Sequence, residues 1–143
     1  MISSSFLFVF ALSFVFSLIG ILLHYEALRG ISFVLPLVAL QPRRKMVLVV
    51  TSILLTHIAE IILYAIAFWL FWELDAPPRL GGMSPAEAFY LSIESFTSLG
   101  TSAGFPIGQL RILAGMEALL GLLLIAWSAS YTYLAMCVLW SEH

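Results

Sequence analysis

The sequence predicts an all-α membrane protein in which three helices cross the bilayer and a fourth, short helix enters it without crossing. Of the 143 residues, 62% are hydrophobic and 10% are charged. Soluble domains are about 45–50% apolar and about 25% charged. A soluble chain of this length could not bury so much apolar surface, so we expect the solvent to be lipid. The formal net charge of −2 offers no basic surface, and we therefore expect no nucleic-acid partner.

The three spans are predicted from length and hydrophobicity. A spanning helix needs about 20 mostly apolar residues, and residues 5–28, 46–74 and 110–140 meet this condition. Residues 5–28 are too long for the apolar part of a signal peptide and lack a basic start and a cleavage site, so we expect a retained helix. Pro36 interrupts the apolar stretch 31–40 that follows. This stretch predicts an interfacial segment or an elbow, with a longer, kinked first helix as the open alternative.

The basic residues predict the orientation. Arg29, Arg43, Arg44 and Lys45 lie between the first two spans, whereas only Arg79 and Arg111, at the start of the third span, lie on the other side. Because loops rich in lysine and arginine stay in the cytoplasm, we expect the loop after the first span to be cytoplasmic. The N-terminus is then outside and the C-terminus inside.

The polar break between the second and third spans predicts a short re-entrant helix. Ser84 fits an N-cap, Pro85 the first helical position and Glu87 the third residue of a capping box. A helix over 85–97 is about 20 Å long, too short for a hydrocarbon core of about 30 Å. The small, polar stretch 98–104 follows it. Non-helical backbone at membrane depth persists only where protein buries it or where it lines a water-filled path, so this stretch predicts a pore loop.

The chemistry of this loop favours cations. The short helix would point its C-terminal, partially negative end toward the membrane interior. Backbone carbonyls and the hydroxyls of Thr97, Ser98, Thr101 and Ser102 are oxygen donors that can replace the water shell of an alkali ion. One chain supplies only one such strand, so a ring around an axis implies a symmetric oligomer.

Two runs of residues carry a family resemblance. Residues 92–100, SIESFTSLG, resemble the pore helix and filter entry of tetrameric potassium channels. More narrowly, the region is similar to small bacterial potassium-channel-like proteins, whose pore segment ends in T-T-L-G-Y-G-D. In those proteins an arginine, a glutamate and a glycine recur at the spacing of Arg111, Glu117 and Gly121, and the interval from Gly100 to Arg111 matches without a gap.

The resemblance implies a two-helix pore domain over residues 46–143, preceded by an N-terminal helix and elbow over 1–45. Its parts would be an outer helix at 46–74, a pore helix at 85–97, a filter at 98–104 and an inner helix at 110–140. It further implies a homotetramer in a bacterial inner membrane, with K⁺ or Na⁺ as the permeant ion and no other cofactor. The residues that align with the family's filter begin at the end of the pore helix and are Thr97, Ser98, Leu99, Gly100, Thr101, Ser102 and Ala103.

The chain departs from the family within this filter. Thr101 replaces the aromatic residue, Ser102 the second glycine and Ala103 the acid. An alternative alignment places residues 102–106 against the potassium-channel filter motif T-V-G-Y-G, but it puts Pro106 at the position of the last glycine. A potassium-selective pore, a wider pore, a pore for another cation and a non-conducting accessory protein with the same fold therefore remain open.

Three acidic or basic side chains within the apolar segments are candidate site residues. Glu94 lies one helical turn before Ser98, where it is either a carboxylate behind the filter or a structural acid. His57 and Glu60 share one face of the second span. They predict either a metal or proton site or an interhelical polar clamp. We favour the clamp and expect no metal, because the sequence offers no evident further ligands.

Near the start of the third span, Glu117 is expected to line the pore or to pair with His57 or Arg111. Gly121 is either a gating hinge or a close helix contact. His24, with Tyr25 and Glu26, is expected at the cytoplasmic interface. The sequence contains no nucleophile elbow, phosphate loop or zinc-protease motif, so we expect no enzyme.

Overall fold

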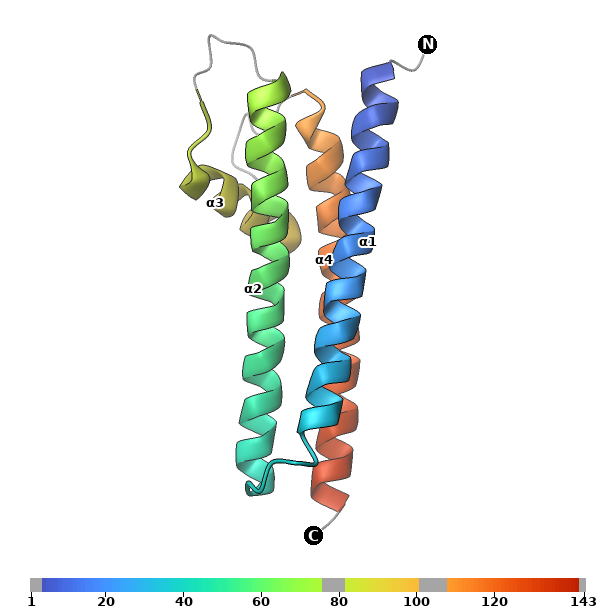
Figure 1. The fold of residues 1–143 in the computed structure, drawn as a ribbon, viewed down its shortest axis with the longest axis vertical. Coiled ribbons are helices and arrows are strands. Elements are labelled where there is room, and N and C mark those ends of the chain that lie inside the picture. The colour runs from blue at the N-terminus through green and yellow to red at the C-terminus, as the bar shows by residue number, and fades with distance from the viewer. Residues whose placement is uncertain (1–3, 76–81, 101–107, 142–143) are drawn as a thin grey trace.

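The computed structural model describes residues 4–75, 82–100 and 108–141, and these form an all-α fold (Figure 1). The four helices are α1 (Ser4–Val34), α2 (Pro42–Asp75), α3 (Pro85–Phe96) and α4 (Leu110–Ser141). The long helices α1, α2 and α4 stand side by side, and each contacts the other two. The short helix α3 crosses the bundle on the side of α2 and α4, which are the helices that it contacts.

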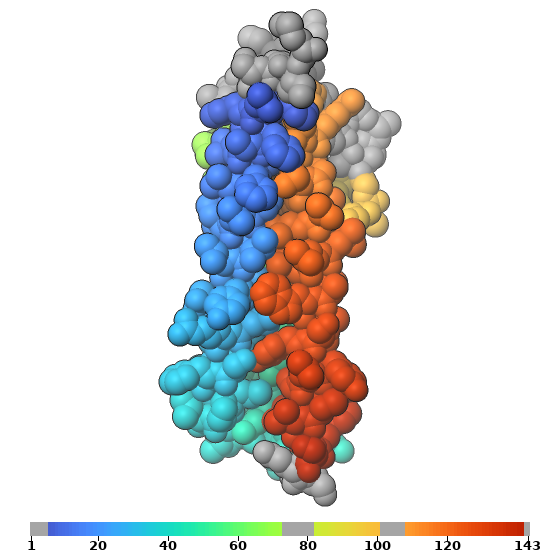
Figure 2. All heavy atoms as spheres, turned by 90° about the vertical axis from the view of Figure 1, so that its right-hand side faces the viewer, coloured from blue at the N-terminus to red at the C-terminus, as the bar shows by residue number. Residues whose placement is uncertain are grey.

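The predicted all-α architecture with three long apolar helices is confirmed. Phe6–Val34, Pro42–Trp72 and Leu110–Ser141 are each long and apolar enough to cross a membrane. Their outward faces carry large hydrophobic side chains, including Phe14, Leu22, Leu55 and Leu123. Figure 2 shows α1 and α4 packed against each other along their length. This arrangement is consistent with a multi-pass membrane protein whose outer surface is solvated by lipid.

The connection between α1 and α2 is shorter than expected. α1 continues to Val34 and stops two residues before Pro36, because the residue preceding a proline is disfavoured in helical geometry. α2 begins at Pro42, four residues before the predicted start at residue 46. Proline suits the first turn of a helix, and the carbonyl of Gln41 accepts hydrogen bonds from the N–H groups of Arg44 and Lys45. Part of the predicted elbow is therefore helix.

The capping box predicted for α3 is confirmed. The Ser84 hydroxyl accepts a hydrogen bond of 3.2 Å from the N–H of Glu87, and Glu87 Oε2 accepts one of 2.7 Å from the N–H of Ser84. This second bond lowers the pKa of the Glu87 carboxyl below its ordinary value. With 12 residues, α3 is about 18 Å long, which is too short to cross a bilayer.

Replacing the cap is expected to weaken the start of α3. Ser84→Ala should lower the free energy of unfolding by about 1 kcal/mol, measured by denaturant titration in mild detergent, because the N–H of Glu87 loses its acceptor. Ser130→Ala is the control, since the described partner of that exposed hydroxyl is a carbonyl of its own helix. The stabilisation that Glu87 adds is present above the ordinary carboxyl pKa and is lost as pH falls through its lowered value. Equal free energies of unfolding for Ser84→Ala and Ser130→Ala would contradict the capping role of Ser84.

Candidate functional site

The C-terminal end of α3 lies deep within the bundle. Phe96 is its last residue, and the Phe96 ring lies 5.4 Å from the ring of His57, measured between centroids. His57 is 15 residues from the start of α2 and 18 from its end, which places it more than about 20 Å from either end of that helix. α3 therefore ends close to the middle of α2.

Gly121 allows this end of α3 to touch α4. A Cβ at Gly121 would overlap the carbonyl oxygen of Phe96 and lie 2.9 Å from its carbonyl carbon. Gly115, on the same helix, faces open space instead. Of the two interpretations of Gly121, the close contact between α3 and α4 is present in the structure. The gating hinge stays a prediction.

The chain after α3 turns sharply. Ser98 has φ 54° and Gly100 has φ 87°, both in the left-handed region that favours glycine. The N–H groups of Ser98 and Leu99 bond back to the carbonyls of Ser95 and Glu94 at 3.0 Å. Residues 97–100 are all exposed, and Leu99 is 76% exposed. The other predicted filter residues, Thr101, Ser102 and Ala103, lie outside the described residues.

Glu94 is buried on α3, one turn before Ser98. Its carboxylate accepts a hydrogen bond from the Tyr90 hydroxyl, and this bond together with the negative charge raises the pKa of Tyr90. The backbone carbonyl of Glu94 accepts from Leu99. Glu94 thus holds the turn at the end of α3 through its backbone, and its role behind a filter stays a prediction.

Glu117 joins three helices. Its side chain is fully buried, and Oε1 lies 2.5 Å from the Ser92 hydroxyl of α3. The same hydroxyl bonds to the carbonyl of Ile61 on α2 at 2.8 Å. Within the described part of the chain, Glu117 Oε2 has no hydrogen-bond partner. The described partner of Glu117 is therefore Ser92 rather than His57, and its predicted pairing with Arg111 stays a prediction.

His57 and Glu60 belong to a larger buried cluster. Glu60 is fully buried, and its two carboxylate oxygens lie 2.8 Å from Nδ1 of His24 and 2.8 Å from Nδ1 of His57. On the other side of the two rings, the Ser128 hydroxyl lies 3.3 Å from Nε2 of His24 and 3.0 Å from Nε2 of His57. We call these four residues the His–Glu–Ser ring; it connects α1, α2 and α4.

The interfacial position predicted for His24 is wrong, because its side chain is fully buried. The signal that could have revealed it is periodicity. Ser13, Ser17 and His24 are buried on α1 together with Val9 and Leu28, and their spacings of four and seven residues follow one helical face. Tyr25 and Glu26, the other members of the predicted cluster, are exposed.

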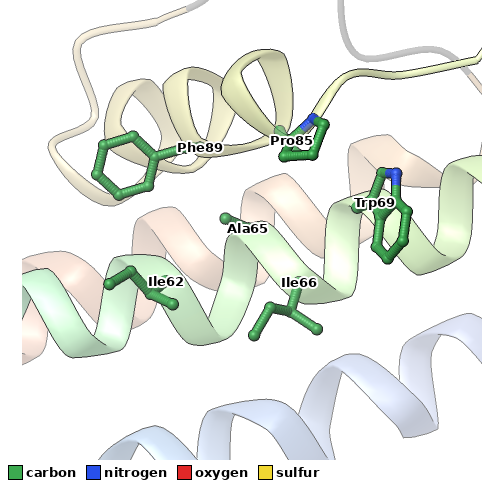
Figure 3. A pocket seen from close by; sticks show the side chains of 7 residues that line it. Ile62, Ala65, Ile66, Trp69, Pro85 and Phe89 are labelled. Atoms are coloured by element: carbon green, nitrogen blue, oxygen red, sulfur yellow. The ribbon is translucent and has the colours of Figure 1, made fainter.

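An apolar hollow lies between the outward sides of α2 and α3 (Figure 3). Ile62, Ile66 and Trp69 of α2 and Phe89 of α3 are among its lining residues. None of its described lining residues is titratable or able to bind a metal, so these residues can contact an apolar group but supply no catalytic or ligating side chain.

No family model, curated protein or solved structure matches this chain. The features of the chain that bear on function are therefore the geometry of the end of α3 and the buried polar groups beside it.

Proposed function

We propose that this chain is one subunit of a homotetrameric cation channel with the potassium-channel-like pore fold, set in a bacterial inner membrane. The observation that carries the proposal is the exposed turn at residues 97–100, which follows a helix ending beside the middle of α2. Lipid cannot hydrogen-bond to backbone groups, and each unpaired group there costs several kcal/mol. The turn must therefore face water or other protein, and a ring of subunits around a water-filled axis provides both.

The charges around this turn support a cation as the permeant ion. α3 ends beside it, so the partially negative end of the helix dipole lies at the turn. Among the described residues, three acidic residues are buried, Glu60, Glu94 and Glu117, with no buried lysine or arginine. An interior of this composition attracts cations and repels anions. K⁺ and Na⁺ are the ions that we propose.

The number of subunits and the path follow from the resemblance of residues 92–121 to tetrameric potassium channels. In this arrangement α2 is the outer helix, α3 the pore helix and α4 the inner helix, and carbonyls and hydroxyls of residues 97–103 surround the ion. α1 packs outside this unit against α2 and α4. The N-terminus lies outside the cell and the C-terminus in the cytoplasm.

The alternative is a non-conducting accessory protein with the same fold. The replacement of the second filter glycine by Ser102 favours it, because consecutive carbonyls can point toward an axis only where the backbone adopts angles that serine resists.

Ion flux from liposomes tests the proposal. Purified protein should release K⁺ or Na⁺ from loaded vesicles and leave Cl⁻ inside. Gly100→Asp should reduce the cation flux at least tenfold, since any side chain is strained at φ 87°. Gly30→Ala is the control, because Gly30 lies on α1 and no atom lies within 4 Å of the position that its Cβ would take.

Two outcomes separate the alternatives. Mass measurement of the purified complex should give four chains. A clean oligomer that passes neither K⁺ nor Na⁺ would reject the channel and support the accessory protein.

A further inference from the structure

The His–Glu–Ser ring contains the donor set of a metal site. The ligand atoms of His24, His57 and Glu60 all lie within 4.8 Å of one another. Two imidazoles and one carboxylate are donors that Zn²⁺ binds at about 2.0–2.2 Å, usually with a fourth ligand to complete a tetrahedron. Such bonds place neighbouring ligand atoms about 3.3 Å apart, so the present N–O separations of 2.8 Å need only a small expansion.

With both histidines neutral and Glu60 ionised, the four hydrogen bonds of the ring are one proton short, and either an added proton or a bound metal ion removes the shortage. Each neutral histidine has a single N–H. If both Nδ1–H groups donate to the Glu60 carboxylate, both Nε2 atoms become acceptors. The Ser128 hydroxyl then has one proton for two acceptors, at 3.0 and 3.3 Å. In one of these two contacts, a lone pair of the Ser128 oxygen would then face the lone pair of a histidine Nε2. Leaving polar atoms unpaired in this way is costly in a buried site.

A metal ion on the Glu60 side removes this shortage. With the metal bound at both Nδ1 atoms, each histidine carries its proton on Nε2. Both Nε2–H groups then donate to the Ser128 oxygen, which has two lone pairs to accept them. Histidine ligands in metal sites regularly donate their second N–H in this way. All four contacts are then satisfied with neutral histidines and an ionised Glu60.

The surroundings also favour a cation. Aromatic rings flank both histidines, with Trp127 at 5.3 Å from His24 and Phe96 at 5.4 Å from His57 between centroids. The buried residues of the described chain include three glutamates and no lysine or arginine. A divalent ion would offset the negative charge of an ionised Glu60 carboxylate, which is fully buried, in a region where an uncompensated charge is costly.

We propose that His24, His57 and Glu60 bind one divalent transition-metal ion of the zinc class, with Ser128 orienting the two imidazoles. The site joins α1 to α2, and through Ser128 to α4. This proposal is independent of ion conduction, because none of its four residues belongs to the predicted filter.

Metal loading tests the proposal on the whole protein in detergent. Protein stripped with a chelator and reloaded with Zn²⁺ alone should retain one ion per chain by elemental analysis. Loading with Co²⁺ alone should give the visible absorption of a four-coordinate ion with nitrogen and oxygen ligands. Ser128→Ala should weaken the Zn²⁺ affinity about 10–100-fold and still reach one ion per chain at saturation, as expected for a group that orients the ligands.

Ligand variants and controls complete the experiment. His24→Ala and Glu60→Gln should each abolish stoichiometric binding. Glu26→Gln should retain it, since Glu26 is exposed and pairs with Arg29, and His143→Ala tests for binding by the terminal histidine. Native protein that binds neither Zn²⁺ nor Co²⁺ after reloading would overturn the proposal, whether or not the variants fold. Binding that survives Glu60→Gln would also overturn it.

Discussion

Gly121→Ala is expected to force the end of α3 away from α4 and to lower the free energy of unfolding by about 1–3 kcal/mol. The added Cβ would lie far inside van der Waals contact with the carbonyl oxygen of Phe96. A flexible side chain could rotate away from such a contact, but a backbone carbonyl moves only with its helix. The shift should also displace the turn at 97–100, so cation flux should fall together with stability.

Gly115→Ala is the matched control for this change. Gly115 lies on the same helix, and no atom lies within 4 Å of the position that its Cβ would take. Alanine is the better helix former by about 1 kcal/mol, so this variant should be neutral or slightly more stable. Both variants are compared by denaturant titration in detergent. Equal stabilities would contradict the contact, and a loss of flux in Gly121→Ala without a loss of stability would favour the hinge.

The features that were predicted from sequence depend on neighbouring residues. The start of α3 was predicted because Ser84, Pro85 and Glu87 interact within one helical turn. The three long helices were predicted because hydrophobic length needs no knowledge of packing partners. Helix ends were less accurate, since α1 ends beyond the predicted residue 28 and α2 starts before residue 46.

The features that were missed join residues far apart in the chain. Ser128 contacts His24 across 104 positions and His57 across 71, and Ser92 contacts Glu117 across 25. A single sequence carries no information on which polar residues of different helices meet. His24 shows the limit: the spacing of Ser13, Ser17 and His24 could have indicated a buried face of α1, but not that the partners of His24 are Glu60 and Ser128.

Glu60→Leu is expected to loosen the attachment of α1 to the rest of the bundle, with a loss of about 2–4 kcal/mol in the free energy of unfolding. Leucine retains apolar volume, so the change mainly removes the acceptor for both Nδ1 atoms of His24 and His57. Two buried N–H groups are then left without the carboxylate. The measurement uses chelator-treated protein, so that the hydrogen-bonded ring is tested without metal.

A double-mutant cycle isolates the contribution of the His24–Glu60 contact. Glu60→Leu, His24→Leu and the double variant are compared, and the double variant should be at least 1 kcal/mol more stable than the sum of the single effects predicts. Glu26→Leu provides the exposed reference. Its pair with Arg29 has both side chains more than half exposed, at 60% and 68%, and such pairs contribute about 1 kcal/mol or less. Additive single effects would contradict direct coupling between the two residues. In that case the burial of His24 would stabilise the bundle through its contact with Trp127, and α1 would be held mainly by apolar packing.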